Sequence, residues 1–170
     1  EFVLDKEIQL NKEHGKAYST RLAFTPLSSQ DHLLSLYTSF IYVGTPTFRH
    51  GDGANNFVQK GKPLGWHKGS DGQDYSVGMN YLNINDFMIS FSTGYLQIGE
   101  ETIMERPYDK YADYLEGPFP SGSIKKNRYF ETFFSYWYRE DFSILSRYYW
   151  SPKSKIFNLE ISMYLFDTFL

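Results

Sequence analysis

The chain has 170 residues and a formal net charge of −3, so its overall electrostatics do not favour a nucleic-acid partner. It contains no cysteine, which excludes disulfides, thiol nucleophiles and cysteine-based metal sites. Aromatic residues make up 19% of the chain, with 15 Tyr and 15 Phe. Tyrosine suits positions where one end of the side chain is apolar and the other is wet, such as membrane interfaces and binding surfaces.

Large apolar residues alternate with small polar ones along most of the chain, and helical periodicity is nearly absent. No apolar run is long enough for a transmembrane helix. The alternation predicts an all-β fold with strands at residues 18–25, 33–43, 75–82, 87–98, 129–138, 142–150 and 156–169. Short turns are expected at residues 26–31, 83–86 and 151–155 and near Glu140, and long polar connections at about 44–74 and 99–127.

The connections alternate between short and long along most of the chain. This is the arrangement of bacterial outer-membrane barrels, which have tight turns on the periplasmic side and longer loops outside. Several strands also carry aromatic residues near their ends and aliphatic residues between them, as the two aromatic girdles of such barrels require. We therefore expect an antiparallel transmembrane β-barrel in the outer membrane of a Gram-negative bacterium. A soluble antiparallel β-sandwich predicts the same alternation and is the alternative.

Seven strands do not close a single-chain bacterial barrel, because the strand number of such barrels is even. Residues 1–10 offer an eighth strand, since apolar residues occupy the even positions except at Lys6. The other explanation is that the chain, which starts at Glu1 without an initiator methionine or a signal peptide, is the C-terminal part of a longer barrel. We favour the second explanation.

The first long connection is the most informative candidate for ligand binding, because it places cations and aromatic rings among glycines. Cations pair with uronate carboxylates, and an aromatic ring stacks on a sugar, so the combination suits an acidic polysaccharide. A solvated outer loop is the alternative reading. The residues concerned are Arg49, Phe57, Lys60, Lys62, Trp66 and Lys68.

Polar residues on the other side of the strands would line or plug the interior of a barrel. The lumen-facing candidates are Arg21, Glu131, Trp137 and Arg147. No pattern indicates catalysis, because the 4 His are scattered, the loop carboxylates have no fixed spacing, and no G-x-S-x-G elbow occurs. We expect no enzymatic activity, no metal and no cofactor.

Two stretches, LLSLYTSFIYVGTPTF and NNFVQKGKPLGWHKGSDGQDYSVG, carry a resemblance to a known family. In that family a strand rich in Tyr and Thr is followed by a polar loop, a Gly-x-x-Leu/Ile-Gly-His-x-x-Gly-x-Asp-like segment and the next strand. The corresponding residues are Gly61, Leu64, Gly65, Gly69 and Asp71. Over residues 2–82 the chain resembles the Wzi-like capsule-assembly outer-membrane proteins, and FVLDKEIQL is similar to their acidic segment ahead of a strand. Trp66 departs from the pattern, which places His directly after the Gly.

The resemblance implies an outer-membrane barrel of about eighteen strands, of which this chain supplies about seven or eight. Members help to attach or assemble capsular polysaccharide or exopolysaccharide at the cell surface, by binding and without known catalysis. The glycan-facing residues would be Lys60, Lys62, Trp66, His67 and Asp71, in an outer or lumen-folded loop. The expected partners are outer-membrane lipid, an acidic polysaccharide and other envelope proteins. The alternatives are a porin or substrate-specific channel and a soluble β-sandwich carbohydrate-binding module.

Overall fold

The structure, a computed structural model, describes residues 15–50, 56–106, 118–139 and 142–163. Strands account for 66% of it, and these residues contain no helix. The prediction of an all-β fold is therefore confirmed. In particular, the described ranges contain no helix long and apolar enough to cross a membrane.

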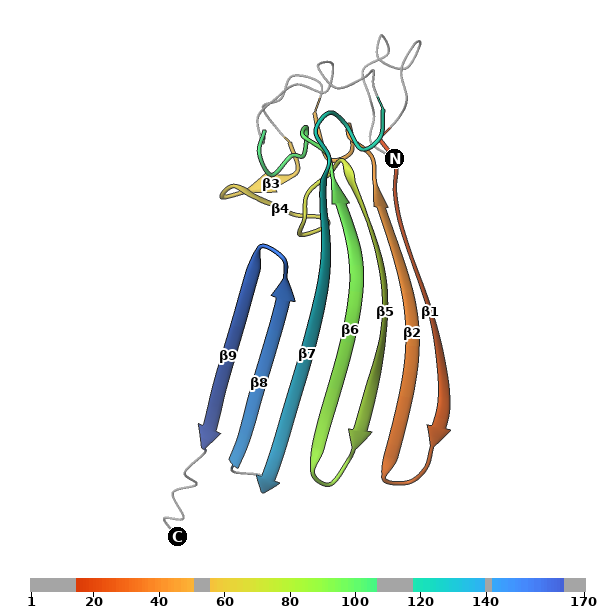
Figure 1. Cartoon of the computed structure of the whole chain (residues 1–170), viewed down its shortest axis with the longest axis vertical. Helices are drawn as coiled ribbons and strands as arrows, with labels where there is room; N and C mark the ends of the chain where they lie inside the picture. The colour runs from red at the N-terminus through yellow and green to blue at the C-terminus, as the bar shows by residue number, and fades with distance from the viewer. Residues whose placement is uncertain (1–14, 51–55, 107–117, 140–141, 164–170) are drawn as a thin grey trace. The chain divides into compact units, whose positions relative to one another are not determined.

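Seven long strands form one sheet, in which each strand pairs with the long strand that precedes it in the chain (Figure 1). They are β1 (Ala17–Ser28), β2 (His32–Val43), β5 (Gly72–Asn83), β6 (Phe87–Ile98), β7 (Lys125–Arg139), β8 (Phe142–Ser151) and β9 (Ser154–Met163). Neighbouring strands run in opposite directions (Figure 1). The sheet is open, with β1 and β9 as its two edges in the described part of the chain.

All seven predicted strands are present in the described residues, and their described ends differ from the prediction by a few residues. The predicted continuation of the seventh strand to residue 169 lies outside the described residues. The first turn is shorter than predicted, because β1 continues through Pro26 to Ser28. Proline is tolerated there because an edge strand leaves backbone N–H groups without a ladder partner. Both long connections are also shorter, since β5 begins at Gly72 and β7 at Lys125. The possible strand at residues 1–10 lies outside the described residues, as does the turn near Glu140.

A small hairpin inside the first long connection was not predicted. β3 (Val58–Gln59) pairs with β4 (Lys62–Pro63) in antiparallel fashion. Lys60 and Gly61 form the turn between them, with φ angles of 50° and 73°. Two successive positive φ angles are typical of a type I′ turn, which glycine adopts without strain and lysine does not. Strands of two residues are too short to show alternation, so the pattern missed them.

The chain divides into two compact units. We call Glu1–Thr20, Phe40–Asp74 and Leu96–Lys126 the connection unit, because it includes both long connections. We call Arg21–Ser39, Tyr75–Tyr95 and Asn127–Leu170 the strand unit. The fully buried side chains of the described residues, Ser70, Asp71 and Ile103, all belong to the connection unit.

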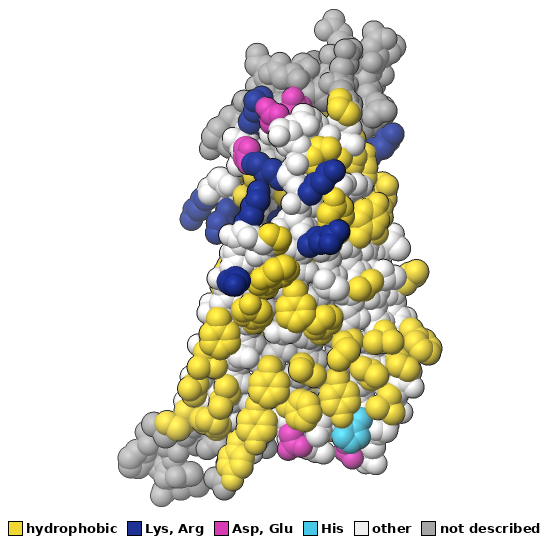
Figure 2. All heavy atoms as spheres, in the orientation of Figure 1, with side chains coloured by type: hydrophobic (Ala, Val, Ile, Leu, Met, Phe, Trp, Pro, Cys, Tyr) yellow, Lys and Arg dark blue, Asp and Glu magenta, His cyan; other side chains and the backbone are white. Residues whose placement is uncertain are grey.

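One face of the strand unit is apolar, and the pairing register identifies it. Phe130 pairs with Trp150, and Tyr148 pairs with Phe157. The ring of Phe91 meets that of Phe130 at a centroid distance of 4.6 Å, which extends the same face to β6. Alternation along each strand assigns further exposed side chains to this apolar face (Figure 2): Leu22, Phe24, Leu36, Tyr75, Val77, Met79, Phe134, Leu159, Ile161 and Met163.

The opposite face of the strand unit, the polar face, carries the four lumen-facing candidates. Glu131 pairs with Tyr149 and Arg147 with Phe133, which places both charged residues opposite Phe130 and Tyr148. Trp137 alternates in step with Glu131, and its Nε1 donates to the Ile84 carbonyl at 3.3 Å. The candidates that lie on this face are Arg21, Glu131, Trp137 and Arg147.

Tyrosine rings on the polar face lie over glycines of the neighbouring strand. A Cβ on Gly78 would come within 2.5 Å of the Tyr37 ring, and one on Gly94 within 2.5 Å of the Tyr129 ring. The Arg21 guanidinium lies over the same Tyr37 ring, 3.8 Å from its centroid. Glycine provides the space in which these rings lie flat against the sheet. The aromatic residues of this face therefore have partners within the sheet itself.

Candidate functional site

Asp71 lies at the centre of the connection unit. Its side chain is 0% exposed, and its backbone has a φ of 57°. Oδ1 accepts hydrogen bonds from Thr45 Oγ1 at 2.8 Å and from the Ser121 N–H at 2.9 Å. Oδ2 accepts hydrogen bonds from Ser121 Oγ at 2.5 Å and from the Glu101 N–H at 3.2 Å. Four donors compensate the carboxylate for the loss of water.

The Asp71 carboxylate joins the two long connections to each other. Thr45 belongs to the first connection, whereas Glu101 and Ser121 belong to the second. The backbone adds a hydrogen bond from Gly99 N to Asp71 O at 2.7 Å. A side chain at position 99 would overlap the carboxylate, so glycine is required there. The prediction that Asp71 faces a glycan is therefore corrected, because all four of these contacts are internal and the residue has no exposed surface.

Arg49 has a similar internal role. Its side chain is only 7% exposed, Nη1 donates to the Arg106 carbonyl at 2.7 Å, and Nη2 donates to the Glu101 carbonyl at 2.7 Å. The guanidinium thus holds the start of the second connection through main-chain oxygens. Its assignment as a glycan-binding residue is also corrected, because the charge is directed to the protein backbone. A cation in a polar loop cannot be placed inside or outside by sequence alone.

The backbone N–H of Glu101 donates a hydrogen bond to Asp71, and the pKa of its side chain is shifted. Burial raises the pKa of the Glu101 carboxyl above its ordinary value, and the Asp71 carboxylate raises this pKa further. Arg106 and Arg49 act in the opposite direction, because a nearby positive charge stabilises the ionised carboxylate. The net shift is upward, so the protonated form of Glu101 is favoured more in the folded protein than in an unfolded chain.

Four of the predicted glycan-binding residues remain accessible around the β3–β4 hairpin. Lys60, Lys62 and His67 are exposed, and Trp66 is partly buried. Lys60 lies in the turn, and Lys62 pairs with Gln59 across the hairpin. We call Lys60, Lys62, Trp66 and His67 the hairpin surface.

Trp66 links the hairpin surface to the start of β5. A Cβ on Gly72 would approach Trp66 Cζ3 to 3.0 Å, so the indole packs closely against the backbone at this glycine. The His67 ring meets the Trp66 ring edge-on at 6.4 Å. The indole Nε1 is buried and has no hydrogen-bond partner among the residues that the structure describes. One part of the ring is thus held by the protein, while its partial exposure leaves another part accessible.

Within the described ranges, no group of three or more His, Cys, Asp and Glu residues has the arrangement of a metal site. No known protein family, curated protein or solved structure matches this chain. The connection unit presents a cationic and aromatic hairpin surface, and the strand unit has an apolar face that no other described residue covers.

Proposed function

We propose that this chain is part of an outer-membrane β-barrel whose long connections present a polysaccharide-binding surface outside the cell. The observation that carries the proposal is the uncovered apolar face. Its side chains Leu22, Phe24, Phe157 and Ile161 are each more than 60% exposed. Burial of one such side chain is worth about 1.5–3 kcal/mol, so a face of this size requires a cover.

Lipid is the cover that best suits this face. A sandwich would need a second packed layer, and the described residues provide none over the apolar face. Lipid chains cover apolar side chains without any further protein. The strands β1, β2, β5 and β6 have 12 residues each, which is enough for a membrane span of about 9–11 residues.

The open edges of the sheet support a larger barrel. Unpaired backbone groups in lipid cost several kcal/mol each, so β1 and β9 need further strands beside them. Additional strands would close the sheet at an even number, with about eighteen as the size that the family resemblance implies. In such a barrel the polar face lines the interior.

The hairpin surface is the proposed contact for an acidic polysaccharide. Lys60 and Lys62 are exposed cations on one hairpin, and the partly exposed Trp66 supplies a ring for stacking. Asp71 and Arg49 act behind this surface, because their hydrogen bonds hold the two long connections in place. Recognition through charge and stacking requires no catalytic group.

The test combines membrane residence with polysaccharide retention. Lys60→Asn and Lys62→Gln remove the two charges, and asparagine also suits the positive φ of position 60. We expect the double variant to remain in the outer-membrane fraction and to lose about tenfold in affinity for an acidic polysaccharide. The matched control is Lys153→Gln, an exposed lysine in the β8–β9 turn.

Two results contradict the proposal. Equal polysaccharide retention by the double variant and the wild-type protein removes the hairpin surface as the binding site. Recovery of the full chain in the aqueous phase without detergent removes the membrane assignment and favours a soluble carbohydrate-binding module.

A channel is the second candidate function, and the polar face is the observation that favours it. The Arg21 guanidinium lies over the Tyr37 ring at 3.8 Å, and the Arg147 guanidinium lies 5.8 Å from the centroid of the Phe133 ring. Charged residues held on rings in this way would select solutes inside a barrel. Planar-bilayer recordings separate the two functions, because a channel gives discrete conductance steps and a plugged anchor gives little current.

A further inference from the structure

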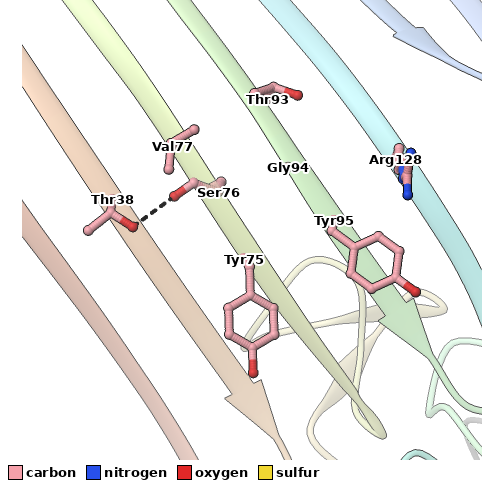
Figure 3. A pocket seen from close by; sticks show the side chains of 8 residues that line it. All are labelled: Thr38, Tyr75, Ser76, Val77, Thr93, Gly94, Tyr95 and Arg128. Carbon is pink, nitrogen blue, oxygen red and sulfur yellow. Dashed lines mark hydrogen bonds between the residues drawn. The ribbon is translucent and has the colours of Figure 1, made fainter.

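The apolar face contains a hollow of 480 Å³ that belongs entirely to the strand unit (Figure 3). Its floor includes Thr38, Val77 and Thr93, and it is bordered by Tyr75, Tyr95 and Arg128. The two tyrosine rings extend from β5 and β6, and the arginine side chain extends from β7 (Figure 3). A depression in an apolar face is a place where a ligand can gain contact area.

Two threonines of the floor have small side chains, and their hydroxyl groups form hydrogen bonds with the neighbouring strands. Thr38 Oγ1 donates to the Ser76 carbonyl at 3.3 Å, and Thr93 Oγ1 donates to the Tyr129 carbonyl at 2.9 Å. With both hydroxyls bonded to main-chain oxygens, the floor requires no further acceptor. Together with Val77 it suits an apolar segment of a ligand.

The rim of the hollow carries a positive charge. Arg128 is exposed, and its guanidinium forms no hydrogen bond or ion pair with any residue in the described part of the chain. A guanidinium is always charged, and its planar set of donors matches a phosphate group with two parallel hydrogen bonds. An arginine that lies next to apolar side chains, with no carboxylate partner among the described residues, is thus suited to an anion from outside the protein.

The position of the hollow along the strands indicates the kind of anion. Tyr75 lies near the start of β5, Tyr95 near the end of β6 and Arg128 near the start of β7, so all three lie where strands meet the long connections. In a membrane barrel, tyrosines at strand ends lie at the level of the lipid headgroups. The anion available at this level is a lipid phosphate.

We propose that this hollow binds a membrane lipid with an anionic phosphate headgroup. Arg128 pairs with the phosphate, Tyr75 and Tyr95 contact the headgroup region, and Val77 with the two threonines contacts the start of an acyl chain. The inference rests on the proposed function, because it requires the apolar face to lie in lipid.

The test uses the complete barrel of which this chain is part, in detergent micelles, and measures bound lipid by native mass spectrometry. The probes are lipid A, lipid A from which the phosphates have been removed, and inorganic phosphate. We expect phosphorylated lipid A to bind in preference to the dephosphorylated form, and Arg128→Gln to weaken its binding by about fivefold to tenfold. Arg147→Gln is the matched control, because it removes an arginine from the polar face and should leave lipid binding unchanged.

Three outcomes overturn the lipid site: equal lipid A binding by Arg128→Gln and wild-type protein, equal loss in Arg147→Gln, or competition by inorganic phosphate alone at similar concentration. Each of these leaves the membrane assignment intact if the protein still requires detergent. Failure of the proposed function has a different signature, because the protein would then stay in solution without detergent.

Discussion

The two units of this protein differ in which side chains they bury and which they expose. In the connection unit, Asp71 and Ser70 are 0% exposed and Arg49 is 7% exposed. In the strand unit, Leu22 and Phe24 are 66% and 67% exposed. The connection unit buries polar side chains together with a few apolar ones, whereas the strand unit exposes large apolar side chains.

This difference follows from how each unit satisfies its backbone. The strands pair their N–H and C=O groups with each other, which frees their side chains to meet an apolar environment. The connections lack regular pairing, so side chains replace it: the Asp71 carboxylate accepts from the Ser121 and Glu101 N–H groups. The stability of the connection unit should therefore depend on a few polar residues, and that of the strand unit on its surroundings.

The largest effect is expected from Asp71→Ala. The substitution leaves the buried donors of Thr45, Ser121 and Glu101 without their acceptor, and we expect a loss of about 3 kcal/mol or more in the free energy of unfolding. Urea unfolding of the protein refolded in micelles measures the loss. Asp31→Ala is the matched control, because Asp31 is exposed in a turn and should change stability by less than about 0.5 kcal/mol. Similar losses in the free energy of unfolding for the two variants would show that the buried carboxylate of Asp71 matters no more than an exposed one.

The second prediction compares the two faces of β9. Leu159, 57% exposed on the apolar face, has Asn158 as its neighbour on the polar face. In lipid bilayers we expect Leu159→Arg to cost about 2–4 kcal/mol, because it places a charge in hydrocarbon. Asn158→Arg should cost far less. Equilibrium unfolding in bilayers measures both, and equal costs would show that lipid does not cover the apolar face.

The third prediction concerns the packing of rings on the polar face. Gly94→Ala places a methyl group within 2.5 Å of the Tyr129 ring, which is stacked on Tyr149 at 6.2 Å. We expect a loss of about 1–2 kcal/mol from this overpacking. Adding Tyr129→Ser should remove the penalty of the methyl group, which a double-mutant cycle measures. Additive costs would show that the ring does not lie over the glycine.

The smallest effect is expected from Glu101→Gln. Burial raises the pKa of Glu101, so the folded protein binds this proton more tightly than the unfolded chain does. The resulting stabilisation is fully present below the pKa of the unfolded chain and is lost as the pH rises through the folded pKa. The stability of the variant minus that of the wild-type protein should therefore be slightly larger at neutral pH than in acid. Thermal unfolding as a function of pH measures this, and a constant difference would contradict it.

Alternation of apolar and polar residues was enough to predict all seven long strands and the residues that share each face. Arg21 and Arg147 were correctly grouped on one side, since side chains alternate strictly along a strand. The candidate site was predicted less well. Lys60 and Lys62 remain accessible, but Asp71 and Arg49 do not, because burial in an irregular segment leaves no periodic signal.

The amino-acid pattern was sufficient for the all-β class, for the places of the seven long strands among the described residues, and for the opposite character of the two faces. The burial of Asp71 and the hairpin turn at Lys60 and Gly61 became visible only in three dimensions. The difference comes from the separation of the interacting residues along the chain. A strand shows its period within a few neighbouring residues, whereas the Asp71 carboxylate meets Thr45 and Ser121 across 26 and 50 residues of chain, a separation at which no local pattern is preserved.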